Sequence, residues 1–261
     1  MRVQDFGRMD GPVYLFGGPY SNLYALEAIS RLIGDADAIC TGDIVAYGGN
    51  PAETISLMRA LNVPTIAGNC ERQIAEGADD CGCGFEEGST CNVLSKGWYP
   101  FALAACDPDA VSWLGDLPEL GVFNHQAKRY AVVHGGATSI NRFLWPSSSD
   151  TDFLEEITAL EGFLGAIDGV IAGHSGIAFH RRVDGYDWIN AGVIGLPPHD
   201  ARPETRYAIL HDEQVVFERL SYDHQSACNA MEAAGLSQGY QKTLLSGVWP
   251  SEDVLPTALR R

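Results

Sequence analysis

The alternation of apolar and polar positions predicts short strands that alternate with amphipathic helices. Residues 13–16, 38–40 and 63–67 are apolar runs of strand length, and glycine follows each of them within two residues. Leucine and isoleucine recur at helical spacing in residues 23–33, and a second helix is predicted over 51–61, where a proline stands in the first turn. This order of strand, loop and helix predicts βαβ units and a largely parallel sheet.

The rest of the chain continues this pattern after one interruption. Residues 77–95 are rich in Gly, Asp, Glu and Cys, which predicts a long loop or insertion. Further strands are predicted at residues 130–133, 170–172, 188–190, 206–210 and 214–217, the last three as an antiparallel set. Because no internal repeat or linker is evident, we predict a single α/β domain over residues 1–261. Its motif-bearing core is expected at 13–217, followed by a helical and then irregular extension at 221–261.

Four residues of metal-ligating type follow predicted strands directly. They are Asp43, Asn69, His134 and His174, and each has a glycine beside it. One such pair alone is typical of an ordinary turn, but four in series indicate a site. Because ligands of open α/β sheets bind at the carboxyl ends of the strands, we expect the four side chains to converge. Oxygen and imidazole nitrogen ligands suit a divalent transition metal, namely Fe, Zn, Mn or Ni.

The order of these residues resembles that of the calcineurin-like metallophosphoesterases, in particular their branch of small bacterial phosphatases and diadenosine-tetraphosphatase-like proteins. The similar blocks span about residue 14 to residue 210 and close with residues 190–197. They include the pairs Gly42-Asp43, Gly68-Asn69, His134-Gly135 and Gly173-His174. The resemblance implies a four-layer α/β/β/α sandwich with a phosphoesterase site that holds two metal ions.

Three positions depart from the pattern of that family. The resemblance places Gly18, Tyr20 and Gly176 where family members have the Asp, His and His that hold one of the two metals. The ligands that it implies for the other metal are the four residues named above, and all of them are present. We therefore predict a reduced site with one divalent transition metal and without a second.

Three further residues are candidates for a catalytic role. Cys70 stands where the family has a His, and it is either a thiolate ligand or nucleophile, or a small buried residue. Tyr20 could donate a hydrogen bond in place of the missing metal. Arg142 could meet an anionic substrate or form a surface ion pair. Glu71 is either a base or an acidic residue in the first turn of a helix, and the second interpretation is favoured. The sequence assigns no role to three cysteines of the interrupting segment, Cys81, Cys83 and Cys91.

The charge balance narrows the classes of partner. Acidic residues outnumber basic ones by 34 to 17, for a formal net charge of -17. A basic stripe of the kind that binds nucleic acid or an anionic membrane is missing from the sequence, so we expect neither partner. The sequence has no apolar run of bilayer-spanning length, and acids interrupt its N-terminal residues, unlike those of a signal peptide. An odd number of cysteines, seven, is typical of the reducing cytoplasm, where we expect the protein.

These observations predict a metal-dependent, phosphoesterase-like hydrolase that acts on a small phosphorylated compound. A cation in the site would locally reverse the repulsion between an acidic protein and a phosphate group. Two alternatives stay open. One is a metal- or ligand-binding regulatory protein on the same fold that turns nothing over, and the other is non-phosphoester metal chemistry that involves Cys70. The sequence identifies neither substrate nor metal, and it leaves open whether the chain forms a homo-oligomer.

Overall fold

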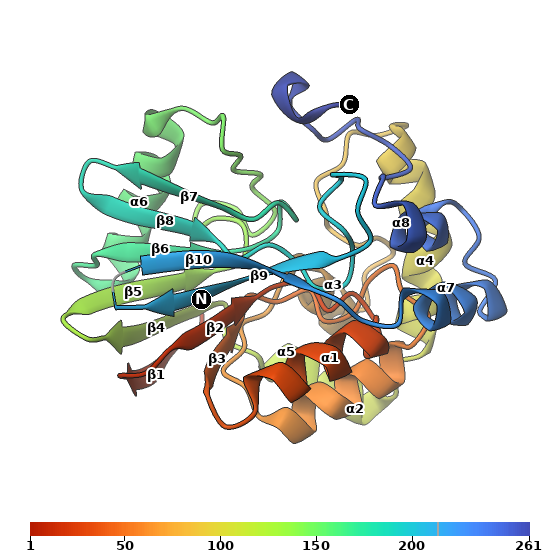
Figure 1. Ribbon diagram of the computed structural model, residues 1–261, viewed down its shortest axis with the longest axis horizontal. Coiled ribbons are helices and arrows are strands. Elements are labelled where there is room, and N and C mark those ends of the chain that lie inside the picture. Colours follow the sequence, from red (N-terminus) through yellow and green to blue (C-terminus); the bar gives the residue numbers. More distant parts are fainter. Residues whose placement is uncertain (213) are drawn as a thin grey trace.

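Two β-sheets form the centre of the computed structural model, which describes residues 1–212 and 214–261 (Figure 1). The larger sheet contains, in spatial order, β1 (Val3–Met9), β4 (Leu120–His125), β5 (Lys128–Val133), β6 (Gly169–Ala172), β8 (Tyr186–Asn190) and β7 (Phe179–Val183). The smaller sheet contains β10 (Gln214–Leu220), β9 (Thr205–His211), β2 (Val13–Phe16) and β3 (Asp37–Cys40).

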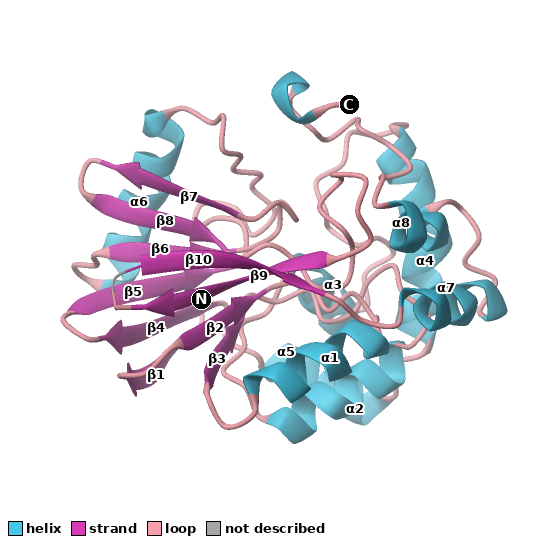
Figure 2. Cartoon of the chain, in the orientation of Figure 1, coloured by secondary structure: helices cyan, strands magenta, loops and turns pink. Residues whose placement is uncertain are grey.

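Helices cover the outer faces of both sheets (Figure 2). They are α1 (Leu23–Ile33), α2 (Pro51–Leu61), α3 (Asn69–Glu76), α4 (Thr90–Ala104), α5 (Pro108–Asp116), α6 (Asp150–Leu164), α7 (His224–Ala233), α8 (Tyr240–Ser246) and a short 3-10 helix at Thr257–Leu259. Buried side chains of α6 pack with those of the larger sheet, and buried side chains of α1 pack with those of the smaller one. This arrangement confirms the predicted four-layer α/β/β/α sandwich.

Strand side chains alternate between the inner core and the helical layers. Val13 and Leu15 of β2 point into the core between the two sheets, where they meet Val132 of β5. Tyr14 and Phe16, the alternate residues, pack on the helix side. Because both faces of the strand are covered, β2 has a continuous apolar sequence instead of an alternating one.

Three predictions about the strands are wrong. Residues 63–67 form an isolated bridge between Thr65 and Cys40 in place of a strand, since Pro64 has no N–H with which to extend a ladder. The sheets are mixed instead of largely parallel, because the pairs β2–β9, β4–β5, β7–β8 and β9–β10 are antiparallel. Finally, β8 lies parallel to β6 in the larger sheet and does not join β9 and β10.

Several elements carry no apolar run that would predict them. The edge strands β1 and β7 have polar side chains at most of their exposed positions, so neither shows a buried-strand pattern. The interrupting segment is also shorter than predicted, since α4 begins at Thr90. Ser89 caps that helix by accepting a hydrogen bond from the N–H of Asn92.

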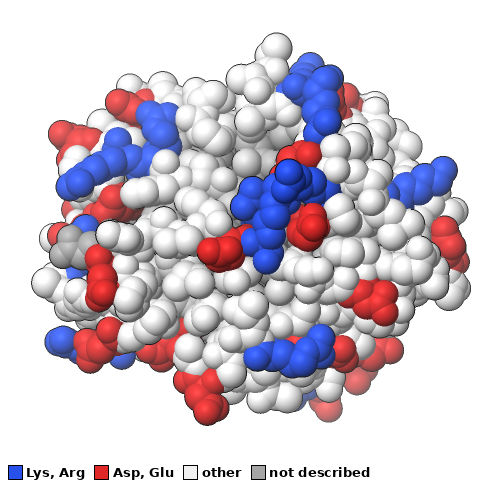
Figure 3. Space-filling view, in the orientation of Figure 1, with Lys and Arg blue, Asp and Glu red and all other residues white. Residues whose placement is uncertain are grey.

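The surface mixes charges of both signs. Acidic and basic side chains lie next to one another on the face shown in Figure 3. Ion pairs such as Arg219 with Asp200 and Arg181 with Asp150 join charges from different elements. None of the described helices has both the length and the apolar character needed to cross a membrane.

Candidate metal centre

The four predicted ligand residues converge on one ring nitrogen, Nε2 of His134. This atom lies 3.0 Å from Asn69 Oδ1, 3.2 Å from His174 Nδ1 and 3.3 Å from Asp43 Oδ2. His134 and His174 follow β5 and β6, which are parallel neighbours, so their side chains meet at the same sheet edge. Asp43 follows β3 of the other sheet, and Asn69 is the first residue of α3. All four side chains are buried.

Hydrogen bonds fix the orientation of two of these side chains. The other ring nitrogen of His134, Nδ1, lies 2.7 Å from the carbonyl oxygen of Thr41. A carbonyl can only accept, so Nδ1 carries the proton and Nε2 of the neutral ring presents its lone pair to the centre. The amide nitrogen of Asn69 donates to the carbonyl oxygen of Cys81 at 2.8 Å, which turns its Oδ1 towards His134.

The chemistry of this donor set fits a bound cation. Lone pairs of Asp43, Asn69, His134 and His174 face one another across about 3 Å, and they repel unless a proton or a metal ion lies between them. Asp43, His134 and His174 place their ligand atoms within 4.8 Å of one another. Nε2 of His174 is buried without a hydrogen-bond partner among the described residues. The residues present therefore suit a divalent metal.

The pKa shifts of Asp43, His134 and His174 arise from burial and from the charges of neighbouring residues. Burial lowers the pKa of His134, but the Asp43 carboxylate, the Thr41 carbonyl and the Glu71 carboxylate together outweigh this effect, and the net shift is upward. Burial raises the pKa of Asp43, yet His134 and His174 bring it below its usual value. Burial and the neighbouring His134 lower the pKa of His174 to about 3, so this ring stays neutral and keeps a free lone pair. These shifts stabilise the ionised form of the Asp43 carboxylate and a positive charge next to it.

The loop of Asp43 is held by a buried carboxylate, that of Glu71. Asp43 and His174 both have left-handed backbone conformations, with φ of 57° and 60°. Glu71 accepts hydrogen bonds from the backbone N–H groups of Asp43 at 2.7 Å, Gly68 at 2.8 Å and Val45 at 3.2 Å. It lies in the first turn of α3 as predicted, but its contacts with the Asp43 loop are not evident from the sequence. Burial and the charge of Asp43 raise its pKa to about 7.

The comparisons with known proteins decide the family. The sequence model of the calcineurin-like phosphoesterases matches residues 12–194, the larger part of the chain. The chain therefore belongs to the calcineurin-like phosphoesterase family. Members of this family typically bind divalent metals, and family and fold together suggest phosphoester hydrolysis.

The chain is similar over most of its length to proteins from several organisms. An uncharacterised protein of Methanocaldococcus jannaschii is 26% identical over 220 residues, which cover 80% of this chain and 86% of that protein. A metallophosphoesterase structure from Sphaerobacter thermophilus superimposes with a TM-score of 0.71 at 22% identity, covering 92% of this chain and all of that one (100%). A hypothetical protein of Pyrococcus horikoshii gives a TM-score of 0.74 at 17% identity, with 90% and 98% covered. At these identities the two structures show the fold alone.

Aromatic rings fill the space beside two of the positions that depart from the family pattern. The ring of Tyr20 lies against Gly18, where an added Cβ atom would be 2.6 Å from the Tyr20 Cζ atom. The indole of Trp249 lies 3.5 Å from the place of a Cβ on Gly176. Trp249 is anchored by its indole N–H, which donates to the carbonyl oxygen of Pro197 at 2.6 Å. A side chain at position 18 would collide with the ring of Tyr20, whereas the Cβ of a side chain at position 176 would be in ordinary van der Waals contact with Trp249.

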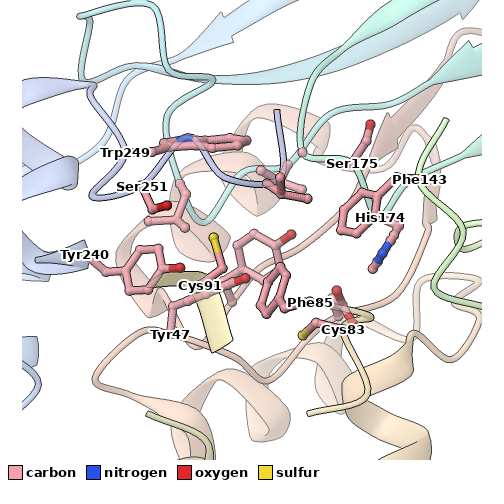
Figure 4. Close-up of a pocket in the computed structure, with 16 residues that line it drawn as sticks. Tyr47, Cys83, Phe85, Cys91, Phe143, His174, Ser175, Tyr240, Trp249 and Ser251 are labelled. Atoms are coloured by element: carbon pink, nitrogen blue, oxygen red, sulfur yellow. The ribbon is translucent and has the colours of Figure 1, made fainter. Parts of the chain in front are cut away.

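A pocket opens beside the candidate metal centre (Figure 4). Its empty volume is about 580 Å³, part of which is open to solvent. Asp43 and His174 reach it from the metal centre, and most of the other lining side chains are aromatic or aliphatic. Lys and Arg are absent from the described residues that line it.

The Cys70 thiol lies next to the side-chain amide of Asn69, the preceding residue. The amide nitrogen of Asn69 is 3.5 Å from Cys70 Sγ and 3.3 Å from Cys83 Sγ. A hydrogen bond with Cys83 lowers the pKa of the Cys70 thiol, but burial and the charge of Asp43 raise it further, so the net shift is well upward. Of these two thiols, Cys83 is the one that lines the pocket. The roles proposed for Cys70 stay predictions.

The two other candidate residues lie in different settings. Tyr20 lines the pocket next to Asp43, as expected for a residue that could contact substrate. Arg142 lies against α6, where its Nη1 is 2.7 Å from carboxylate oxygens of both Glu155 and Glu156. The structure therefore gives Arg142 the ion-pair setting that the sequence left open as its alternative, and it is not among the pocket-lining residues.

Proposed function

We propose that this protein hydrolyses a phosphoester of a small molecule, using one divalent transition metal held by Asp43, Asn69, His134 and His174. The observation that carries the proposal is that lone-pair donors of Asn69, His174 and Asp43 lie within 3.3 Å of a fourth, His134 Nε2. When bound, such an ion supplies Lewis acidity towards a phosphoryl oxygen and lowers the pKa of water. The cytoplasm remains the expected location, and neither nucleic acid nor a membrane is expected as a partner.

The chain's own side chains would position the reacting phosphoryl group. Burial raises the pKa of Tyr20 well above its usual value, so the phenol keeps its proton and can donate a hydrogen bond to a phosphoryl oxygen. The carbonyl of Thr41 keeps His134 in the tautomer that presents Nε2 to the centre. The apolar walls of the pocket would exclude water and strengthen both interactions.

The aromatic rings beside Gly18 and Gly176 support a single ion. The ring of Tyr20 takes up the space of a side chain at position 18, and the indole of Trp249 lies beside position 176, so aromatic rings flank two positions that would have to supply ligands to a second metal. Tyr20 would then take over part of the electrostatic role of that metal through its hydrogen bond.

The test combines metal removal with a ligand substitution. His174→Ala removes one imidazole, and we expect metal content and turnover of a phosphatase and phosphodiesterase panel to fall together. His211→Ala, an exposed residue, serves as the matched control. Full turnover by metal-free protein would contradict the proposal. Tight metal binding without turnover on any substrate of the panel would favour the regulatory alternative.

A further inference from the structure

Aromatic side chains lead from the metal centre into the pocket. The ring of His174 packs on Phe143 with centroids 4.3 Å apart, and Phe143 in turn faces Phe85 at 6.4 Å. On another side, Tyr47 contacts both Tyr20 at 4.8 Å and Tyr240 at 4.5 Å. Figure 4 shows the labelled rings around the pocket, with Trp249 on the opposite side from Cys83. Rings from separate segments of the chain therefore enclose one space.

The charges of this space limit what it can hold. Asp43 supplies a carboxylate and His174 an imidazole at its inner end, and the other polar groups of the lining include the hydroxyls of serine and tyrosine and the thiols of Cys83 and Cys91. With no Lys or Arg among the described lining residues, nothing there would neutralise a second phosphate or a carboxylate. The protein as a whole also carries a net charge of -17. The pocket outside the metal centre would therefore repel a second anionic group of a substrate, such as the further phosphates of a polyphosphate or a carboxylate.

We propose that the pocket binds an uncharged aromatic group of a substrate that has a single phosphoryl group, so that the protein prefers aryl phosphoesters. This inference rests on the proposed function, since it places the phosphoryl group at the metal centre. Flat rings with both faces apolar pack best against the edges and faces of other aromatic rings.

Phosphonates test binding without turnover. Calorimetric titration of the metal-loaded protein with phenylphosphonate and methylphosphonate should give a preference of about tenfold or more for the phenyl compound, from aromatic packing and burial. Phe85→Ala and Trp249→Ala should each remove most of that preference. Phe163→Ala, a matched loss of an exposed ring on α6, should leave it unchanged. Circular dichroism melting of each variant verifies that it is folded.

Kinetics separate this inference from the proposed function. With phenyl phosphate and methyl phosphate as substrates, the pocket variants should lower kcat/KM for the phenyl ester alone. Each variant is compared with the wild type on the same ester, so the difference in leaving group between the two esters cancels. Equal losses for both esters, or equal affinity for both phosphonates, would overturn the aromatic preference while leaving hydrolysis intact. A preference for phenylphosphonate without any turnover would support aromatic binding in the pocket and contradict the proposed hydrolase function.

Discussion

Gly68 sets how closely the start of α3 approaches Asp43. An added Cβ would lie far inside contact distance of the Asp43 carboxylate, although the backbone φ of −88° is open to any residue. We therefore expect Gly68→Ala to displace that carboxylate, to lower metal affinity by about tenfold or more, and to cost about 1–3 kcal/mol of stability from overpacking. Calorimetric metal titration and chemical unfolding measure the two effects.

The control for this change is Gly162→Ala on α6, where an added Cβ meets nothing within 4 Å. Alanine is a better helix former than glycine, so this variant should be slightly more stable and bind metal as the wild type does. Unchanged metal affinity in Gly68→Ala would show that Asp43 is not a ligand.

Cys70→Ser distinguishes packing from chemistry at the residue next to Asn69. Serine preserves the approximate volume of the side chain, so a packing role predicts retained turnover with a modest loss of stability. If the thiolate binds the metal or attacks the substrate, turnover should drop by orders of magnitude, because a serine hydroxyl ionises far less readily. Because the pKa of Cys70 is raised, we expect the first result. Cys106→Ser is the control, because the half-buried Cys106 thiol donates a hydrogen bond to the carbonyl oxygen of Ala102, four residues earlier in the chain.

Single residues were predictable where their signal is local. Asp43, Asn69, His134 and His174 each follow an apolar run and adjoin a glycine, a pattern that can be read without the fold. The contacts that orient them are not local. The Cys81 carbonyl that turns the Asn69 amide lies 12 residues away in sequence, in a segment whose composition indicates only a loop.

At the scale of elements, the first turn of α3 joins two loops of the site. Glu71 of this turn binds three backbone N–H groups from the Asp43 and Gly68 segments. Glu71→Gln keeps the shape but replaces one acceptor oxygen by an NH₂ group that faces donors. We expect a loss of about 1–3 kcal/mol in the free energy of unfolding and about tenfold weaker metal binding. Urea unfolding and metal titration measure these, with the exposed Glu76→Gln at the end of the same helix as control. Equal stability of the two variants would contradict this role of Glu71.

Element prediction succeeded for buried, continuous apolar strands and failed at the edges. The strand β2 and helix α2 have the predicted bounds, because their apolar pattern or proline start is strong. Residues 63–67 look equally apolar, yet Pro64 limits them to one bridge. The edge strands β1 and β7 expose polar side chains, and so they lack the apolar signal altogether.

At the scale of the whole molecule, the site exists because two sheets meet. His134 and His174 come from the larger sheet, and Asp43 comes from the smaller one. Periodicity along the chain indicates strands but does not state which sheet each joins, so the pattern alone predicted one largely parallel sheet. The two-sheet sandwich followed from the family resemblance, which uses residue order across the full length of the core.

The central claim is one metal ion per chain, held by four residues and required for turnover. The most direct measurement is the metal content per chain of purified, active protein by inductively coupled plasma mass spectrometry, repeated on Asp43→Asn. The account predicts about one transition metal per active chain, and coordinated loss of metal and turnover in the variant. Two fully occupied ions per chain, or undiminished turnover after the metal is gone, would contradict it.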